Sequence, residues 1–307
     1  MKYLLIIIFS FFFIKSNSQA NNNESQNFDF NIYKSLEKAL VNKDKVLYLD
    51  LSNKGLTTIP KAIKELKNLK ELSLNNNNIN AVPLFLKEMK GLKSLDLSNN
   101  NFSNFPLNIF ELKGLIKLSL SENRINVLPV NIGQLKKLEW LVLHNCNLEF
   151  LPKSIGQLVK LEKLYLDYNR IYYLPQTIGQ LVNLDVLGLR FNHLTTLPKS
   201  IGNLKTLRIL YLNNNKINNL PYSIGELINL ETLVLFDNQL KDLPESIGQL
   251  QKIRTIWVNK NNLKSLPKSI FFLSSLESID IRNNYIANDE IIKLKKMPNL
   301  ICCLGKE

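Results

Sequence analysis

One pattern of amino acids recurs along the chain at a fixed interval of 23 residues. Residues 151–171, with the sequence LPKSIGQLVKLEKLYLDYNRI, are a clear copy of its general form, LPxxIGxLxxLxxLxLxxNxL. We number each repeat from the leucine that opens LxxLxLxxN, which is Leu161 in this copy. Position 6 is then Leu, Val or Ile in eleven successive repeats, from Leu51 to Ile281. A period of this length indicates a solenoid, in which each repeat packs only against its neighbours.

The pattern within one repeat predicts a short strand followed by a return segment. Positions 4 and 6 are apolar and two residues apart, so on a strand both point inward while positions 3 and 5 point outward. Parallel strands need a connection on their far side, and positions 10 to 23 supply it. Ten of the eleven prolines hold position 15, from Pro60 to Pro267, and the apolar positions 18 and 21 are spaced as on one face of a short helix. Eleven such strands stack into a parallel sheet roughly 50 Å long.

Asparagine fills position 9, where the chain turns from the strand into the core. A buried amide is tolerated only when it is hydrogen-bonded, so we expect bonds to backbone groups of its own and the next coil. Lys54 takes this position in the first repeat and Cys146 in the fifth. Glycine at position 19 allows close backbone packing in the middle repeats. The asparagines are Asn77, Asn100, Asn123, Asn169, Asn192, Asn215, Asn238, Asn261 and Asn284, and the glycines are Gly133, Gly156, Gly179, Gly202, Gly225 and Gly248.

These motifs resemble the leucine-rich repeat family. The LPxxIGxL segment is similar to the 23-residue class found in Scribble-like proteins, plant intracellular Ras-group proteins and many bacterial secreted proteins. The resemblance implies an α/β right-handed solenoid, or horseshoe, with a concave parallel sheet of about eleven strands and a convex side of short helices or 3₁₀ turns. It implies no reaction, because what such families share is a frame for binding other proteins.

The remaining segments predict a secreted protein with capped ends. Tyr3 to Ile14 is apolar apart from Ser10, follows Lys2, and precedes small residues at Ser16, Ser18 and Ala20, as in a cleavable signal peptide. The run is too short for a membrane span. The predicted organisation is residues 1–20, a signal peptide; 21–45, a linker and a capping helix within Phe28–Val41; 46–298, eleven repeats; and 299–307, a cap remnant in which Leu300–Leu304 is a truncated strand.

Composition excludes several partners and activities. The formal charge is +13, or +11 without Lys2 and Lys15, but the lysines are scattered and only six arginines occur, which favours a solvated surface over a nucleic-acid partner. His144 and His193 are the only histidines, and neither has metal-ligand spacing to other residues. No glycine-rich phosphate loop, GxSxG or HExxH occurs. We therefore expect no enzyme activity, no cofactor and no metal.

Three cysteines do not make a disulfide framework. Cys146 replaces a buried asparagine, so we expect an inert thiol. Cys302 and Cys303 are adjacent and would face opposite ways on a strand, which leaves one free to pair between molecules in an oxidising compartment.

The outward positions of the strand carry the information that distinguishes one repeat from another. Positions 5 and 7 are small and polar in the first four repeats and become large and aromatic from the fifth. Exposed aromatic residues and arginine dominate binding energy at interfaces. The predicted ligand-binding residues on this concave face are Trp140, Tyr165, Tyr168, Arg190, Phe191, Tyr211, Phe236 and Trp257.

These observations favour a secreted, periplasmic or cell-envelope module that binds a protein ligand through repeats five to ten. Three alternatives stay open at this stage. The aromatic residues would also suit a carbohydrate or cell-wall ligand, or they simply cover neighbouring strands. A cytoplasmic signalling scaffold would require the hydrophobic start to remain uncleaved.

Overall fold

A computed structural model of the protein describes residues 32–297 and residue 300. The predicted signal peptide, Cys302, Cys303 and the predicted strand at Leu300–Leu304 lie wholly or almost wholly outside the described residues. None of the helices in the described part of the chain combines the length and the hydrophobicity that crossing a membrane requires.

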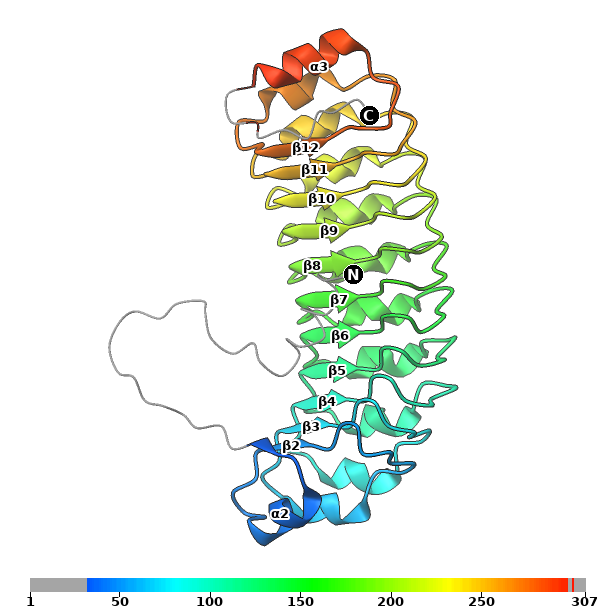
Figure 1. Ribbon diagram of the computed structural model, residues 1–307, viewed down its shortest axis with the longest axis vertical. Coiled ribbons are helices and arrows are strands. Elements are labelled where there is room, and N and C mark those ends of the chain that lie inside the picture. The colour runs from blue at the N-terminus through cyan, green and yellow to red at the C-terminus, as the bar shows by residue number, and fades with distance from the viewer. Residues whose placement is uncertain (1–31, 298–299, 301–307) are drawn as a thin grey trace, which may run out of the picture. The chain divides into compact units, whose positions relative to one another are not determined.

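In the described part of the chain, twelve parallel strands form one sheet and follow one another in sequence order (Figure 1). From β2 onward, paired residues are one repeat apart, as in Leu164 with Leu187. The strands are β1 (Ile32–Tyr33), β2 (Tyr48–Asp50), β3 (Glu71–Ser73), β4 (Ser94–Asp96), β5 (Lys117–Ser119), β6 (Trp140–Val142), β7 (Lys163–Tyr165), β8 (Val186–Gly188), β9 (Ile209–Tyr211), β10 (Thr232–Val234), β11 (Thr255–Trp257) and β12 (Ser278–Asp280).

The return segments form 3₁₀ helices on the opposite side of the solenoid from the sheet (Figure 1). Each begins directly after the proline at position 15, whose fixed φ suits the residue before the first turn. They are η1 (Lys61–Glu65), η2 (Leu84–Glu88), η3 (Leu107–Glu111), η4 (Val130–Gln134), η5 (Lys153–Gln157), η6 (Gln176–Gln180), η7 (Lys199–Asn203), η8 (Tyr222–Glu226), η9 (Glu245–Gln249) and η10 (Lys268–Phe272).

One continuous hydrophobic core runs the length of the repeats. The inward side chains at positions 4 and 6, such as Leu164 and Leu166, are completely buried. The flanking residues of the same strand, Lys163 and Tyr165, are only half-buried. This alternation, which β2, β6, β7 and β9 share, fits the expected inward and outward sides of a strand and leaves a sheet face that varies from repeat to repeat.

The asparagines at position 9 bond their own coil and the preceding coil, not the next one. In Asn169, Oδ1 accepts hydrogen bonds from the backbone N–H groups of Cys146 (3.0 Å) and Leu148 (2.9 Å). Its Nδ2 donates to the carbonyls of Leu143 (2.7 Å) and Leu166 (2.9 Å). One buried amide therefore satisfies backbone groups of two successive repeats.

Cys146 is fully buried, as its position predicts. Its thiol donates to the carbonyl of Leu120 at 3.2 Å, so it supplies one of the bonds that asparagine makes elsewhere. Burial raises the pKa of Cys146 to about 12, which keeps the sulfur protonated and unreactive at neutral pH.

The N-terminal end differs from the expected capping helix. The spacing of apolar residues predicts a helix within Phe28–Val41, but Ile32 and Tyr33 form β1, which pairs with β2. Within the described part of this segment, residues 32–41, only α2 (Leu36–Val41) is helical, and Ser35 caps it by accepting a hydrogen bond from the Lys38 N–H. The sheet edge at β2 offers unpaired backbone groups, and β1 satisfies them. This is why the sheet has a twelfth strand.

A longer helix, α3 (Asn288–Lys295), follows the last repeat strand. It starts near where proline is due in this repeat, and Glu290 of this helix accepts a hydrogen bond from the Leu266 N–H at 2.7 Å. Leu294 of α3 is fully buried in the core, so the helix covers inward residues of the preceding coil (Figure 1).

Alanine at position 19 is expected to destabilise the stack. A Cβ atom at Gly179 would lie 2.3 Å from the carbonyl oxygen of Ser200 in the next coil, so the two coils would have to separate. We expect Gly179→Ala to lower the free energy of unfolding by about 3 kcal/mol in urea titrations. Gly91→Ala is the control, since its nearest neighbour is the flexible Lys70 ammonium at 3.3 Å. Equal midpoints for the two variants would contradict close packing at position 19.

Candidate interaction site on the concave face

Position 8 adopts a left-handed backbone conformation in every repeat. Asparagine or aspartate, which tolerate this conformation best among the residues other than glycine, fill it in seven of the eleven repeats. Tyr168 (φ +56°) and Phe191 (φ +52°) are aromatic exceptions in consecutive repeats. A bulky residue with positive φ lowers the free energy of unfolding by on the order of 1–2 kcal/mol. Tyr168 and Phe191 therefore each destabilise the fold.

Tyr168 and Phe191 stack on each other at the rim of the concave face. Their ring centroids are 4.2 Å apart with an interplanar angle of 16°. The two residues are 39% and 40% exposed, although the stack shields one face of each ring. His144 lies edge-on to Tyr168 with centroids 4.9 Å apart. The result is an aromatic row across three repeats, in which Tyr168 and Phe191 are exposed and His144 is buried at one end.

A buried ion pair lies beside this row. Arg190 donates to both carboxylate oxygens of Asp167, from Nε at 3.1 Å and from Nη2 at 2.9 Å. Asp167 is almost completely buried and also accepts a hydrogen bond from the Arg190 backbone N–H at 2.8 Å. The guanidinium then lies 4.8 Å from the ring centroid of Tyr211. Arg190 is thus held in one orientation, in which it supports an aromatic ring.

Gly188 makes room for that carboxylate. It lies between Tyr165 and Tyr211 in the sheet register, and a Cβ here would meet Asp167 Oδ2 at 3.0 Å and the Tyr165 ring at 3.2 Å. Burial raises the pKa of Tyr165 to about 12, so this phenol stays neutral and can donate a hydrogen bond to a partner. The strand position between the two tyrosines is therefore occupied by the Asp167 carboxylate and the edge of the Tyr165 ring.

Trp140 lies between two lysines. Lys117 of β5 and Lys163 of β7 flank it in the register, and their ammonium groups lie 4.5 and 4.2 Å from the centre of its ring system. Burial lowers the pKa of Lys163. Neither lysine has an ion pair among the described residues, so both are available to an anionic group of a ligand.

The structure places the other two predicted residues further along the face. Trp257 is 39% exposed and is separated from Tyr211 by Val234, which is buried. Its indole Nε1 donates to Ser278 at 3.3 Å. Phe236 is half-buried at position 7 of the same region. Tyr168, Arg190, Phe191 and Tyr211 thus form the compact part of the predicted site, next to Tyr165, whereas Trp140 and Trp257 lie on either side.

Stability is expected to fall as the pH drops below about 6.5, the pKa of an unperturbed histidine. Burial is the largest cause that lowers the pKa of His144, against the opposing effect of the carboxylates of Asp167 and Glu122. Below this pH, His144 therefore binds a proton in the unfolded chain but not in the folded chain. The stability that is present above this pH is lost below it. The loss is bounded at about 1.4 kcal/mol per pH unit. Urea midpoints between pH 7.5 and 5 should fall less for His144→Gln than for the wild type; identical slopes would contradict this role.

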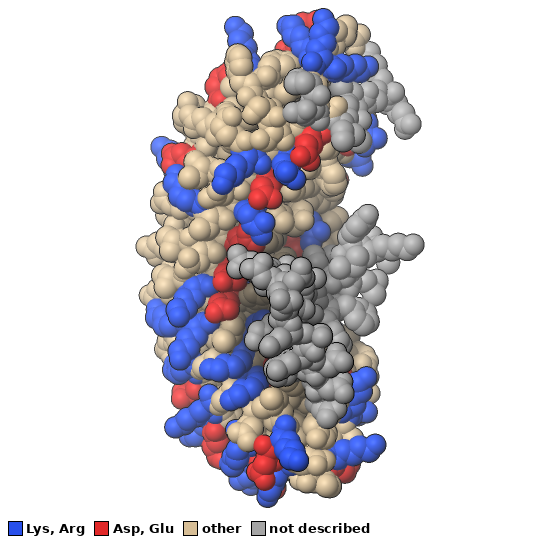
Figure 2. Space-filling view, turned by 90° about the vertical axis from the view of Figure 1, so that its left-hand side faces the viewer, with Lys and Arg blue, Asp and Glu red and all other residues tan. Residues whose placement is uncertain are grey.

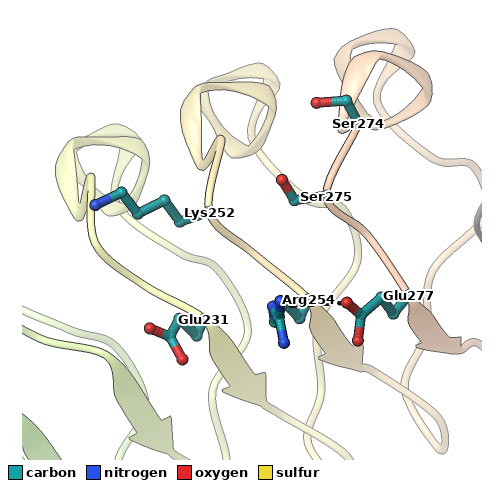
Figure 3. A pocket seen from close by; sticks show the side chains of 6 residues that line it. All are labelled: Glu231, Lys252, Arg254, Ser274, Ser275 and Glu277. Atoms are coloured by element: carbon teal, nitrogen blue, oxygen red, sulfur yellow. Dashed lines mark ion pairs between the residues drawn. The ribbon is translucent and has the colours of Figure 1, made fainter. Parts of the chain in front are cut away.

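A hollow of about 530 Å³ lies on the flank of repeats nine to eleven, away from the aromatic residues. Figure 3 shows its lining of Glu231, Lys252, Arg254, Ser274, Ser275 and Glu277. Arg254 pairs with Glu277 at 3.6 Å, and Lys252 donates to Asn229 at 2.7 Å. Small-molecule sites are mostly apolar, whereas this lining is polar and largely partnered within the protein. The concave aromatic surface is the better candidate.

No group of three or more His, Cys, Asp or Glu side chains within the described residues is arranged to hold a metal ion. The site therefore consists of aromatic, cationic and hydrogen-bonding groups.

Three family models of leucine-rich repeats match the chain. The model described as "Leucine-rich repeat region" matches residues 85–170 and 108–189, "Leucine rich repeat" matches residues 182–240, and a third model of the same description matches residues 68–89. The chain is a leucine-rich repeat protein. Among curated proteins, none matches it by sequence.

Solved structures show the same fold in other leucine-rich repeat proteins. A TDR receptor is 28% identical with a TM-score of 0.76, over 88% of this chain and 49% of that one. The ectodomain of the plant membrane receptor kinase GASSHO1/SCHENGEN3 from Arabidopsis thaliana, in complex with CASPARIAN STRIP INTEGRITY FACTOR 2, is 26% identical with a TM-score of 0.66, over 84% and 34%. An internalin from Listeria monocytogenes is 22% identical with a TM-score of 0.67, over 86% and 81%. This chain thus spans about half and about a third of the two receptor chains.

Several residues around the site of this leucine-rich repeat protein were not among the predicted anchors. Asp167 orients Arg190, Lys163 lies over the Trp140 ring, and Gly188 leaves room for the Asp167 carboxylate between the two tyrosines. The sequence does contain a signal for the ion pair: Asp167 and Arg190 both occupy position 7, one repeat apart. Opposite charges at equal positions of adjacent repeats are neighbours in the folded solenoid.

Proposed function

We propose that this leucine-rich repeat protein is a secreted or cell-envelope binding module without catalytic activity. It binds a protein ligand through the aromatic concave face of repeats five to ten. The observation that carries this proposal is the stacked pair of Tyr168 and Phe191, which is exposed and held in a backbone conformation that disfavours aromatic residues. Backbone strain of this kind persists at binding sites. There, the free energy of ligand binding offsets a cost in stability that the isolated fold does not recover.

The composition of the site suits protein recognition. Tyrosine, tryptophan and arginine contribute most at the centres of protein interfaces, because they are large, hold few conformations and combine apolar area with hydrogen bonding. Arg190 is already fixed by Asp167, so little of its conformational entropy is lost on binding. Lys117 and Lys163 occupy positions over Trp140, which leaves less of that ring for a flat sugar to stack upon. This arrangement favours a protein over a carbohydrate ligand.

The solved relatives support a binding role. The receptor ectodomain from Arabidopsis was solved in complex with a partner, and its fold is shared over most of this chain. Secretion rests on the sequence of residues 1–20, and sequencing the mature N-terminus tests it. A start near Gln19 or Asn21 supports export, whereas an intact Met1 inside the cell supports the cytoplasmic scaffold.

Alanine at both Tyr211 and Trp257 is expected to abolish ligand capture while leaving the melting temperature within a few degrees of the wild type. The readout is capture from extracellular material by the immobilised repeat domain, followed by titration of the identified ligand. Tyr222→Ala with Phe272→Ala is the matched control, because these aromatic residues are 66% and 75% exposed on the convex 3₁₀ helices. Retained capture together with a large drop in melting temperature would overturn the proposal, and selective binding on a glycan array would replace it with the carbohydrate alternative.

A further inference from the structure

Lysines that look scattered in the sequence become neighbours on one flank of the solenoid. Position 22 is lysine in four consecutive repeats, and position 2 is lysine in two of them. Because each repeat stacks on the last, equal positions align in columns. We call this surface the lysine band; its members are Lys67, Lys70, Lys90, Lys93, Lys113 and Lys136.

Figure 2 looks onto this flank. Lysine and arginine side chains gather in its lower half, over the N-terminal repeats, while acidic and basic side chains alternate further up. The alternating part corresponds to ion pairs at position 2 of later repeats, such as Arg208 with Asp185 at 2.6 Å. The two halves of one flank thus differ in kind: the C-terminal half neutralises its own charges and the N-terminal half does not.

None of the six lysines forms an ion pair among the described residues, although glutamates hold position 20 in three of the four repeats. Lys113 and Lys136 donate only to neutral groups, the side-chain amides of Gln134 (2.7 Å) and Gln157 (3.0 Å). Like charges in one band repel, and an anionic ligand would relieve that repulsion.

Two glycines let the band lie close to the backbone. Gly91 and Gly114 hold position 23, between the lysine columns. A Cβ at Gly91 would lie 3.3 Å from Lys70 Nζ, and one at Gly114 would lie 3.6 Å from Lys93 Nζ. The ammonium groups of Lys70 and Lys93 therefore lie where the side chain at position 23 lies in most other repeats. There, each is next to the lysine of the following coil.

We propose that the lysine band binds a linear acidic polysaccharide, one whose carboxylate or sulfate groups recur along the chain. Neighbouring coils are about 5 Å apart at the sheet, so the four lysines at position 22 give a row roughly 15 Å long. A row of point charges suits a polymer that lies along the solenoid. This site is separate from the concave face and does not depend on its ligand.

Two other polyanions fit the band less well. Nucleic-acid surfaces add arginine or aromatic residues that read or stack bases, and the band has neither. Membrane-binding surfaces add exposed apolar residues that enter the bilayer. The exposed apolar residues of repeats two to four, such as Leu84, Leu107 and Val130, lie on the convex 3₁₀ helices instead.

The test compares the wild type with a variant in which Lys67, Lys90, Lys113 and Lys136 are glutamine. Heparin serves as the sulfated probe and polygalacturonate as the carboxylate probe, with affinity measured against salt concentration. We expect the variant to lose affinity on the order of 100-fold and to show a shallower salt dependence, since fewer counterions are released. Single-stranded DNA and vesicles of anionic phospholipid are compared at the same salt.

The control variant removes four other lysines that lack ion pairs: Lys199, Lys216, Lys241 and Lys264 to glutamine. Its net charge equals that of the band variant, so it should keep near wild-type affinity. Equal losses in both variants, no polysaccharide binding by the wild type, or tighter binding to DNA or vesicles would each overturn the proposal. Capture of a protein by the concave face is measured in parallel and should be the same for both lysine variants.

Discussion

Replacing Asn169 by alanine is expected to lower the free energy of unfolding by about 5 kcal/mol. The side chain is 5% exposed and accepts two backbone hydrogen bonds from the preceding coil. Its amide nitrogen donates to carbonyls of both coils, at 2.7 and 2.9 Å. Alanine leaves these four buried groups without partners, and each unsatisfied group costs about 1–3 kcal/mol.

Cys146→Asn is the matched variant, and it is expected to change the free energy of unfolding in the opposite direction. Asn100 and Asn123 accept hydrogen bonds from Ile79 and Phe102 of the coils before them. The equivalent donor before Cys146 is the Ile125 N–H, for which no acceptor is present among the described residues. Asparagine here should therefore raise stability by about 1 kcal/mol. Urea titrations followed by circular dichroism measure both effects, and a loss below 2 kcal/mol for Asn169→Ala would show that the amide is not essential.

Asparagine at both Tyr168 and Phe191 is expected to reduce affinity for the protein ligand by on the order of 100-fold while leaving stability within about 1 kcal/mol of the wild type. The two effects separate because the substitution changes two terms of opposite sign. It removes a ring stack worth roughly 0.5–1.5 kcal/mol, and it relieves two strained left-handed residues. The affinity for the ligand has no compensating gain, because the substitution only removes exposed aromatic surface.

The same two residues also decide between a binding site and mere coverage of the strands. If they only cover the sheet, the asparagine pair lowers the melting temperature and leaves capture unchanged. The control is Asn76→Ala with Asn99→Ala, which alters the same position in repeats where it is polar. That pair should leave ligand affinity unchanged. A result in which both pairs weaken binding equally would place the ligand along the whole rim instead of on the aromatic row.

The repeat frame could be predicted from the sequence because the period determines which residues face inward. Leu164 and Leu166 are buried and Tyr165 is not, as their alternation predicts. The N-terminal end was harder, since the apolar spacing around Leu36 suits a helix while Ile32 and Tyr33 are drawn into the sheet by the open edge of β2. A sheet edge is a tertiary feature that local spacing does not reveal.

The location of the candidate site could be predicted from the sequence, but the contacts between its side chains could not. Aromatic residues at outward positions indicate where the face changes, and their role in binding stays a prediction. The stack of Tyr168 on Phe191 depends on the left-handed backbone at position 8, and the burial of His144 depends on the neighbouring ring and on Glu122. The lysine band is not evident along the chain because each of its columns recurs only once per coil. It emerges only when residues are arranged by position around the solenoid.

The direction of the asparagine bonds has a consequence for how the protein grows during synthesis. Each asparagine completes the coil made just before it, and the first repeat, which follows β1 and α2 and no other repeat, carries Lys54 instead. A ribosome releases the N-terminal coils first. The youngest coil therefore waits with open backbone groups until the following one emerges, so the folded portion trails synthesis by one repeat.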